Sequence, residues 1–247
     1  MKIAFQMDPL ERLNKKGDST LSLARAAAGR GYELFHYEPG HLQMVMGPHA
    51  PKISAAGHTL LLDKATDDWK LGEQSRRDLS GFDVILMRQD PPFDMAYITA
   101  THILENLPKK TRVINDPVGV RNAPEKLLIS LTPQFLPPTL IARDREAIEE
   151  FRKQHGDIIL KPLHGYAGHG IFHLRTDDNN LAALLETLGE RTNEPWMVQK
   201  FLPVATQGDK RVVIMDGEPV GVFTRFPEKN ETRGNMRVGG RPEPATL

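Results

Sequence analysis

Cysteine is absent from this 247-residue sequence. Disulfide bonds, a thiolate nucleophile and a cysteine-ligated metal are therefore excluded, and the composition is typical of a reducing compartment. Net charge is also lacking, because the 32 lysine and arginine residues equal the 32 aspartate and glutamate residues in number. Such a chain has no overall attraction to nucleic acid or to an anionic membrane, so any cationic function must come from local clustering.

Long apolar segments are lacking as well. No run approaches the roughly 20 apolar residues that span a bilayer, and the apolar stretch from Ile3 ends at Asp8, too early for a secretory signal. We therefore expect a cytoplasmic protein with neither membrane nor nucleic-acid partners. With 39% hydrophobic and 26% charged residues, the chain is globular and can bury a substantial core divided between domains.

Residues 1–121 alternate between strand and helix patterns. KIAFQM and YELFHY are predicted strands on either side of a helix from Thr20 to Gly31, and DVILMR and RVIND are predicted strands around a helix from Tyr97 to Asn106. Between these pairs, Leu42 to Asp63 holds short apolar runs broken by GPHAP and AAGH, which predict hairpins. This order predicts an N-terminal domain with an open, Rossmann-like α/β sheet.

A segment rich in proline and glycine, NDPVGVRNAPE at residues 115–125, marks the end of that domain. After it, PPTLIA, DIILKPL and GIFHLR are predicted strands, and DREAIEEFRKQHG and NLAALLETLG are predicted helices, so residues 122–192 form a small α+β domain. From Trp196 the chain becomes β-rich, and Asp216-Gly217 predicts a tight hairpin. Residues 193–247 thus begin a third domain whose sheet the last residues do not complete.

The segment DIILKPLHGYAGHGIF, residues 157–172, indicates a phosphate site. Lys161 closes an apolar strand and supplies a point cation, while Gly165, Gly168 and Gly170 let backbone N–H groups approach an anion. The spacing matches neither G-x-G-x-x-G nor the P-loop, and a strand follows rather than a helix. The loop is therefore predicted to cover a nucleotide triphosphate as a flap; a hairpin with a mobile glycine tip is the alternative.

Other segments supply groups that suit a nucleotide. Lys126 follows the proline-marked boundary and could join Lys161 at one polyphosphate, and a solvated surface lysine is the alternative. A strand end carries the residues Gln199, Lys200, Phe201 and Leu202, where backbone groups could read an adenine edge. An ordinary core position for Phe201 and Leu202 is the alternative there.

Guanidinium groups gather near the end of the sequence. Arg211 lies at the start of a strand, and Arg233 and Arg241 lie on glycine-flanked loops. Arginine at such positions can hold phosphates and carboxylates through two hydrogen bonds. Together the three could hold a transferring phosphoryl group, and a solvated polar loop is the alternative.

In the first domain, charged residues directly follow predicted strands. Asp8 follows the first strand, and Arg88, Asp90 and Asp94 follow a later one, at the carboxyl ends where open sheets bind ligands. Arg88 suits a substrate carboxylate and Asp90 or Asp94 an amine, and helix capping explains the aspartates equally well. A metal site at the histidines of the glycine-loop region is not expected, because the loop provides no fixed geometry.

Taken in order, several segments resemble the bacterial glutathione synthetase family of the ATP-grasp ligases over nearly the whole chain. They are MDP, RQDPPFD, NDP with EKL, ILKPLHGYAGHGIF, QKFLP, GDKRVVIMDGEPV and TRGNMRVGGR. The family fold implied is an N-terminal α/β substrate domain followed by two ATP-grasp subdomains. The resemblance implies that Lys126 and Lys161 contact phosphates beneath the glycine loop, that Gln199 to Leu202 hold adenine, and that Asp209 lies near the ribose.

The resemblance also implies a reaction. Arg211, Arg233 and Arg241, with Asn235, would line the region where phosphate and the peptide carboxylate meet. ATP, with Mg²⁺, would phosphorylate the carboxylate of γ-glutamylcysteine, and glycine would attack the acyl phosphate to form glutathione. Because the family is typically oligomeric, a homo-oligomer is a further expectation.

The sequence departs from the family pattern in the glycine loop and at its end. His164 stands where relatives often have an acidic residue, and Tyr166-Ala167 is bulkier than a glycine pair. The family's magnesium ligands belong to a segment that would follow Leu247, so we expect a C-terminally truncated chain without metal ligands, inactive or unstable alone. Two other hypotheses stay open: a non-catalytic nucleotide- or peptide-binding module, and another carboxylate–amine ligase of the same fold.

Overall fold

The computed structural model describes residues 1–15, 17–63, 65–66, 68–190, 192–228, 234–235 and 239–247. The chain divides into two compact units, Met1–Pro124 and Glu125–Leu247. Short 3-10 helices lie at Leu10–Arg12, Pro39–His41, Leu79–Gly81, Ile129–Leu131, Pro133–Phe135 and Pro203–Gln207. Across the described residues, we find no helix with the length and apolar character needed to cross a membrane.

The N-terminal unit is built on one mixed sheet, with the strand order β3-β4-β2-β1-β6-β7 and β5 paired with β4 among the described residues. Its parallel strands are β1 (Lys2–Gln6), β2 (Glu33–Tyr37), β6 (Val84–Met87) and β7 (Arg112–Ile114). β3 (Leu42–Val45), β4 (Lys52–Asp63) and β5 (Asp68–Asp78) form an antiparallel ribbon. The predicted α/β architecture is confirmed.

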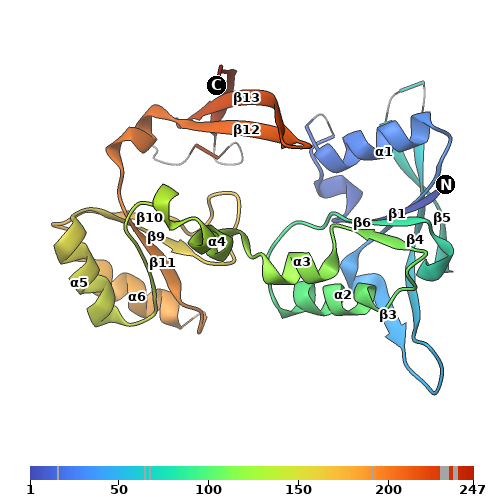
Figure 1. Cartoon of the computed structure of the whole chain (residues 1–247), viewed down its shortest axis with the longest axis horizontal. Helices are drawn as coiled ribbons and strands as arrows, with labels where there is room; N and C mark the ends of the chain where they lie inside the picture. Colours follow the sequence, from blue (N-terminus) through green and yellow to red (C-terminus); the bar gives the residue numbers. More distant parts are fainter. Residues whose placement is uncertain (16, 64, 67, 191, 229–233, 236–238) are drawn as a thin grey trace. The chain divides into compact units, whose positions relative to one another are not determined.

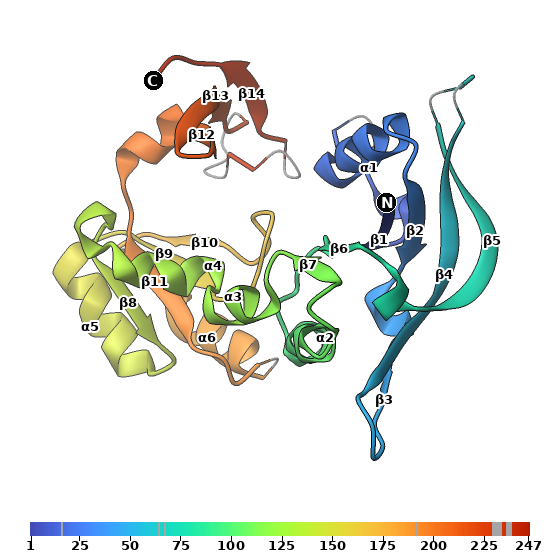
Figure 2. The same cartoon turned by 45° about the vertical axis from the view of Figure 1, so that its right-hand side comes forward.

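Helices cover both faces of the parallel strands (Figure 2). α1 (Ser19–Gly29) packs on the face that carries Phe5, and α2 (Met95–Glu105) packs on the face that carries Ala4. Ala4 and Phe5 are neighbours on β1 and point to opposite faces of the sheet, so β1 contributes to two separate cores. α3 (Pro117–Asn122) follows β7 and packs against α2.

One sequence-based prediction in this unit is wrong, because AAGH does not end a strand. Gly57 lies within β4, a strand of 12 residues. A Cβ atom at position 57 would lie 2.2 Å from the backbone oxygen of His36 on β2, so glycine here permits a close approach of two strands rather than a turn. GPHAP does connect two strands, since Val45 of β3 pairs with Lys52 of β4.

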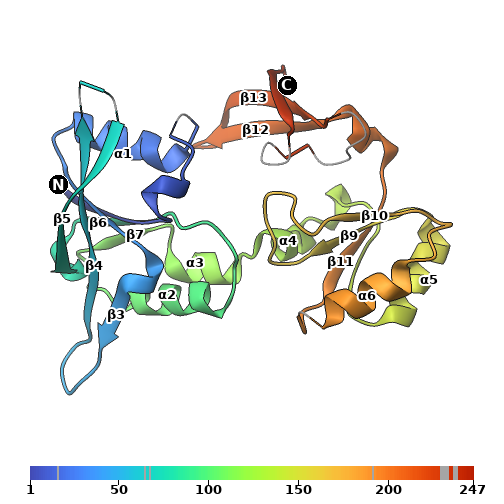
Figure 3. The ribbon, with the colours of Figure 1, turned by 180° about the vertical axis from the view of Figure 1, so that it is seen from behind.

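In the C-terminal unit, an antiparallel sheet has the order β10-β9-β11-β8. Its strands are β8 (Thr139–Ala142), β9 (Ile158–Pro162), β10 (Phe172–Leu174) and β11 (Trp196–Lys200). α5 (Arg145–His155) and α6 (Leu181–Gly189) cover the same face of this sheet (Figure 3), and α4 (Glu125–Leu128) begins the unit. β11 lies between β9 and β8 although it follows the predicted boundary at residue 192, and that boundary stays a prediction.

The second sheet of this unit consists, in the described residues, of β12 (Asp209–Met215), β13 (Glu218–Phe226) and β14 (Arg241–Pro244). β12 and β13 lie side by side (Figure 1) and form the hairpin predicted at Asp216-Gly217. Asp216 has φ 52° and Gly217 has φ 85°, and a two-residue hairpin turn of this kind requires both angles to be positive. The hairpin prediction is confirmed.

Candidate active site

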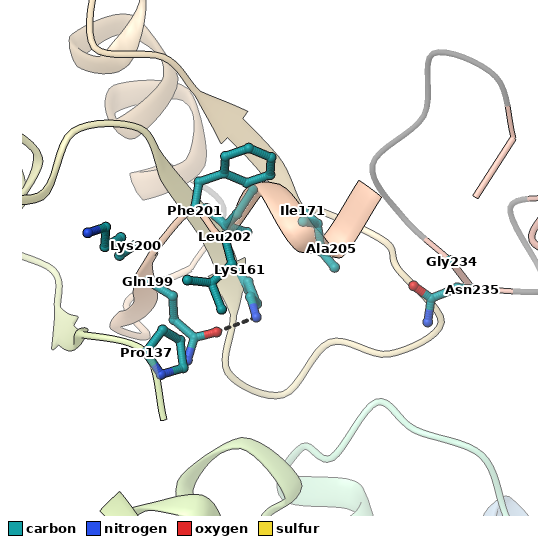
Figure 4. Close-up of a pocket in the computed structure, with 11 residues that line it drawn as sticks. Pro137, Lys161, Ile171, Gln199, Lys200, Phe201, Leu202, Ala205, Gly234 and Asn235 are labelled. Atoms are coloured by element: carbon teal, nitrogen blue, oxygen red, sulfur yellow. Dashed lines mark hydrogen bonds between the residues drawn. The ribbon is translucent and has the colours of Figure 1, made fainter. Parts of the chain in front are cut away.

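Two adjoining cavities in the described part of the C-terminal unit contain most of the residues predicted to bind a nucleotide. The first, which we call the apolar slot, has a volume of about 220 Å³ (Figure 4). Its apolar walls are Pro137, Ile159, Ile171, Phe201, Leu202 and Ala205, and its polar edges are Lys161, Gln199, Lys200, Gly234 and Asn235. A flat, mostly apolar ring with polar edge groups suits this lining.

The second cavity, the cationic chamber, has a volume of about 360 Å³. It is lined by Glu125, Lys126, Lys161, Pro162, Ile171, Arg211, Asn235 and the glycine loop from Gly165 to His169. The slot and the chamber share Lys161, Ile171 and Asn235. A ligand with an apolar ring at one end and negative charge at the other matches the two together.

Alternation along two neighbouring strands determines which side chains face the slot. On β9, Leu160 is fully buried against α5 and α6, so Lys161 points to the opposite face. On β11, Val198 packs with the same helices, and Gln199 lies on the slot side. The ammonium of Lys161 donates a hydrogen bond to Oε1 of Gln199 (Figure 4).

Two ammonium groups lie beside the glycine loop. Nζ of Lys126 donates to the backbone oxygen of Gly165 at 2.6 Å, so this lysine is held at the loop rather than fully solvated. Burial, and then the nearby charge of Lys126, lower the pKa of Lys161 below its ordinary value, while Glu125 opposes the shift. Lys161 therefore lies where an added anion would relieve both burial and repulsion.

The glycine loop takes backbone conformations that other residues rarely adopt. Gly168 has φ 86° and Gly170 has φ 69°. A Cβ atom at Gly165 would lie 2.5 Å from Cγ of Pro162, and one at Gly168 would lie 2.9 Å from Oδ1 of Asn235. Side chains at these positions would thus displace the loop. A strand follows the loop as predicted, since β10 pairs with β9, and movement of the loop as a flap stays a prediction.

The adenine-site residues at the end of β11 are only partly buried. Leu202 is 41% exposed, so its interpretation as a core residue is wrong. Phe201 stacks on His173 with 4.1 Å between the ring centroids, and it contributes a wall of the slot. Lys200 lies at the slot edge.

Asp209 holds two guanidinium groups at the start of β12. Its Oδ2 accepts hydrogen bonds from Nε of Arg211 at 3.0 Å and from Nη2 of Arg225 at 2.7 Å. Arg211 reaches the cationic chamber, as Asn235 does. Sequence reasoning missed Arg225, whose side chain is 13% exposed, because its place opposite Asp209 depends on a register shift within the hairpin.

Of the three predicted catalytic arginines, the structure describes Arg211 and Arg241. Arg233 lies outside the described residues. Arg241 begins β14 opposite Phe226, and it is not one of the described residues that line the slot or the chamber. Of these two described arginines, Arg211 lines the cationic chamber and Arg241 does not.

The predicted substrate residues of the N-terminal unit lie at the carboxyl ends of β1 and β6, which are neighbours in the sheet. Oδ2 of Asp8 accepts a hydrogen bond from the backbone nitrogen of Asp90 at 2.6 Å. Arg88 donates to Oγ of Ser19 at 2.8 Å, at the start of α1. The chain runs outward from β1 to β2 on one side and from β6 to β7 on the other, so the strand order reverses between β1 and β6, the usual position of ligand sites in open α/β folds.

Asp94 has a structural task. Its carboxylate accepts a hydrogen bond from the backbone nitrogen of Tyr97 at 2.9 Å and so caps α2. The capping alternative is therefore confirmed for Asp94, and a role in substrate binding stays a prediction.

Comparison with known proteins points to one family. A model of the prokaryotic glutathione synthetase N-terminal domain matches residues 1–121, and a model of the prokaryotic glutathione synthetase ATP-grasp domain matches residues 125–247. The glutathione synthetase of Brucella melitensis is 47% identical over 247 residues, which are 100% of this chain and 78% of that protein. The glutathione synthetase of Agrobacterium fabrum is 49% identical over 246 residues, 99% of this chain and 76% of that protein.

Solved structures share the fold. A RimK domain ATP-grasp protein from Sphaerobacter thermophilus superposes with a TM-score of 0.59 at 18% identity, covering 91% of this chain and 72% of that chain. The ATP-grasp ligase PsnB, complexed with a precursor variant, Mg and ADP, superposes with a TM-score of 0.59 at 17% identity, covering 100% of this chain and 77% of that chain. At such low identity these likenesses establish the fold alone.

Proposed function

The chain belongs to the prokaryotic glutathione synthetase family, and from this premise we propose that its C-terminal unit binds ATP with adenine in the apolar slot and phosphates in the cationic chamber. The chain is an ATP-dependent ligase that joins γ-glutamylcysteine and glycine to form glutathione. The observation that carries the ATP site is the junction of the two cavities at Lys161.

Each part of ATP is assigned to described residues. Lys126 and Lys161 contact the phosphates, and backbone N–H groups of the loop from Gly165 to Gly170 cover them. Gln199 to Leu202 hold the adenine ring. Asp209 lies near the ribose, where it also orients Arg211.

The reaction requires two transfers. A carboxylate oxygen of γ-glutamylcysteine attacks the γ-phosphorus of ATP, and the bond to the bridging oxygen breaks as ADP leaves. The glycine amine then attacks the acyl carbon, loses a proton and expels phosphate. Arg211, with Arg233 and Arg241, stabilises the phosphoryl charge, and the loop excludes water from the acyl phosphate.

Mg²⁺ accompanies ATP in this proposal, as the PsnB structure is complexed with Mg and ADP. The described residues of this chain do not fit a metal site, since no group of three His, Asp or Glu among them is placed to bind an ion. We therefore assign no metal ligand and no metal-dependent step to them. A homo-oligomer stays a prediction.

Recognition of the peptide is assigned to the N-terminal unit. Asp8 and Asp90 come together at the ends of β1 and β6, and Arg88 is held beside them. In this assignment Arg88 binds a carboxylate of γ-glutamylcysteine, and Asp90 or Asp94 binds its amine.

The substrate assignment is tested by measuring ADP and glutathione release from ATP, γ-glutamylcysteine and glycine with the chain extended to the full length of its relatives, of which it spans 76–78%. We expect both products, and no sustained ADP release when glycine is left out. Ligation with other acid and amine pairs but not with this pair would identify a different ligase. Binding of ADP without turnover of any pair would favour the non-catalytic module.

As the pH rises, nucleotide affinity is expected to decline at a lower pH than it would if Lys161 had the pKa of an ordinary lysine. Only the ammonium form of Lys161 attracts phosphate. Because the pKa of Lys161 lies below its ordinary value of 10.5, the ammonium loses its proton at a lower pH, as the pH rises, than an ordinary lysine would. The dissociation constant of ADP should therefore rise as pH increases through that lowered pKa. Titration calorimetry over a pH series measures the midpoint.

The variant Lys126→Met provides a test of the cause. Removing this neighbouring charge raises the pKa of Lys161, so the decline should move to higher pH even though overall affinity is weaker. An unmoved midpoint would show that Lys161 does not govern the pH dependence.

A further inference from the structure

A chain of hydrogen bonds crosses three neighbouring strands beside the apolar slot. The hydroxyl of Thr139 on β8 donates to the backbone oxygen of Pro137 at 2.7 Å. Nε2 of Gln199 on β11 donates to Oγ1 of Thr139 at 2.9 Å, and Nζ of Lys161 on β9 donates to Oε1 of Gln199 at 2.5 Å. Strand pairing aligns these groups, since Gln199 lies opposite Thr139 in the register.

The direction of every bond in this chain is determined by chemistry. An ammonium can only donate, so the atom of Gln199 that faces Lys161 must be the carbonyl oxygen. A backbone oxygen can only accept, so the single hydroxyl proton of Thr139 is committed to Pro137 and its oxygen accepts from the amide nitrogen. The amide of Gln199 therefore cannot turn over without losing both of its partners.

The result is a hydrogen-bond acceptor held in one orientation at the edge of the slot. Gln199 is 8% exposed, and its carbonyl oxygen points toward Lys161 while Pro137 lies on its nitrogen side (Figure 4). The carbonyl oxygen has a second lone pair, which one bond to Lys161 leaves available. The remaining walls of the slot are mostly apolar, so an unmatched polar edge on a bound ring would find few other partners.

The two common purines differ at the atom that such an acceptor would meet. Adenine carries an amino group at position 6, a donor, beside the acceptor N7, whereas guanine presents acceptors at both positions. An amino group satisfies the lone pair of the Gln199 oxygen, while a carbonyl oxygen would place lone pair against lone pair. We infer that Thr139, by orienting Gln199, makes the slot selective for 6-amino purine nucleotides over 6-oxo purine nucleotides. This inference deepens the proposed function and rests on it.

Thr139→Val removes the hydroxyl while keeping a branched side chain that suits a strand. We expect the ratio of kcat/KM with ATP to that with GTP to fall by about tenfold or more, because the amide loses one anchor and can adapt to a 6-oxo group. The dissociation constant of ADP divided by that of GDP should rise by the same factor. A purely structural defect would weaken both nucleotides alike and leave these ratios unchanged.

Three further variants complete the experiment. Thr139→Ser restores the hydroxyl and should restore the selectivity. Thr187→Val is a matched control on the exposed face of α6, where the hydroxyl donates to the backbone oxygen of Ala183 in the same helix, and it should change neither ratio. Gln199→Leu removes the acceptor directly, so it should also lower the selectivity and serves if Thr139→Val does not fold.

The possible outcomes distinguish failure of the selectivity inference from failure of the proposed ATP site. Full selectivity in folded Thr139→Val, or in Gln199→Leu, would overturn the inference while leaving the ligase assignment intact. If the unaltered chain binds neither ADP nor GDP, the proposed ATP site fails and the inference fails with it.

Discussion

Lys161→Met is expected to lower kcat/KM for ATP by about 10²- to 10³-fold, the usual effect of removing one oriented donor from a developing charge. Lys161 is shared by the slot and the chamber, so its loss affects both the base site and the phosphate site. Methionine keeps much of the apolar length of the side chain but cannot donate to Gln199 or attract phosphate. Steady-state kinetics and ADP titration measure the two consequences.

Fold and function are separable in this variant. The lowered pKa of Lys161 indicates that burial and the nearby charge of Lys126 make its ammonium form unfavourable in the folded protein. Replacing it with an apolar side chain should therefore leave the melting temperature unchanged or raise it. Lys153→Met, at an exposed position on α5, is the matched control and should retain normal kinetics. Turnover of Lys161→Met close to that of the control would remove Lys161 from the mechanism.

Leu160→Ala is expected to reduce the free energy of unfolding by about 2–5 kcal/mol, the range for large-to-small changes in a packed core. Leu160 is fully buried in the cluster that includes Ile148, Trp196 and Val198 beneath α5 and α6. Truncation removes these contacts and leaves a cavity that the sheet and helices cannot easily fill. Urea unfolding of the C-terminal unit, followed by circular dichroism, measures the change.

The same substitution should spare the ligand site. Because Leu160 points away from the slot, ADP affinity measured well below the unfolding transition should stay near that of the unaltered chain. Ile141→Ala is the control, since Ile141 on β8 is 39% exposed and its truncation should change stability far less. Strongly reduced ADP affinity in folded Leu160→Ala, or equal destabilisation by both variants, would contradict the assignment of faces on β9.

Leu160 and Lys161 show which features the local sequence pattern can predict. The apolar run DIILKPL indicates a strand, and the lysine at its end next to a glycine loop indicates an anion site. Helix starts are also local features, because Asp18, Asp94 and Asp144 all accept hydrogen bonds from the first turns that follow them. The Asp216-Gly217 hairpin belongs to the same class, since its signal lies within the turn itself.

Partners that depend on register could not be predicted in this way. Counting outward from the Asp216-Gly217 turn would place Thr224 opposite Asp209, but a register shift between Val213 and Ile214 places Arg225 there instead. The sequence around Gly57 likewise predicted a turn. Gly57 instead permits the close approach of β4 to β2, and the residues next to it in the sequence do not indicate this contact.

Amino-acid pattern alone was enough to predict the α/β architecture, the hairpin, the glycine loop and Lys161 beside it, because each depends on residues that are close along the chain. The polarity of the slot required the folded molecule. Thr139 and Gln199 are 60 positions apart, and only the strand order β9-β11-β8 brings them into one line with Lys161. Hydrogen bonds of that kind depend on which strands become neighbours and in what register, and periodicity within a single strand carries no information about either.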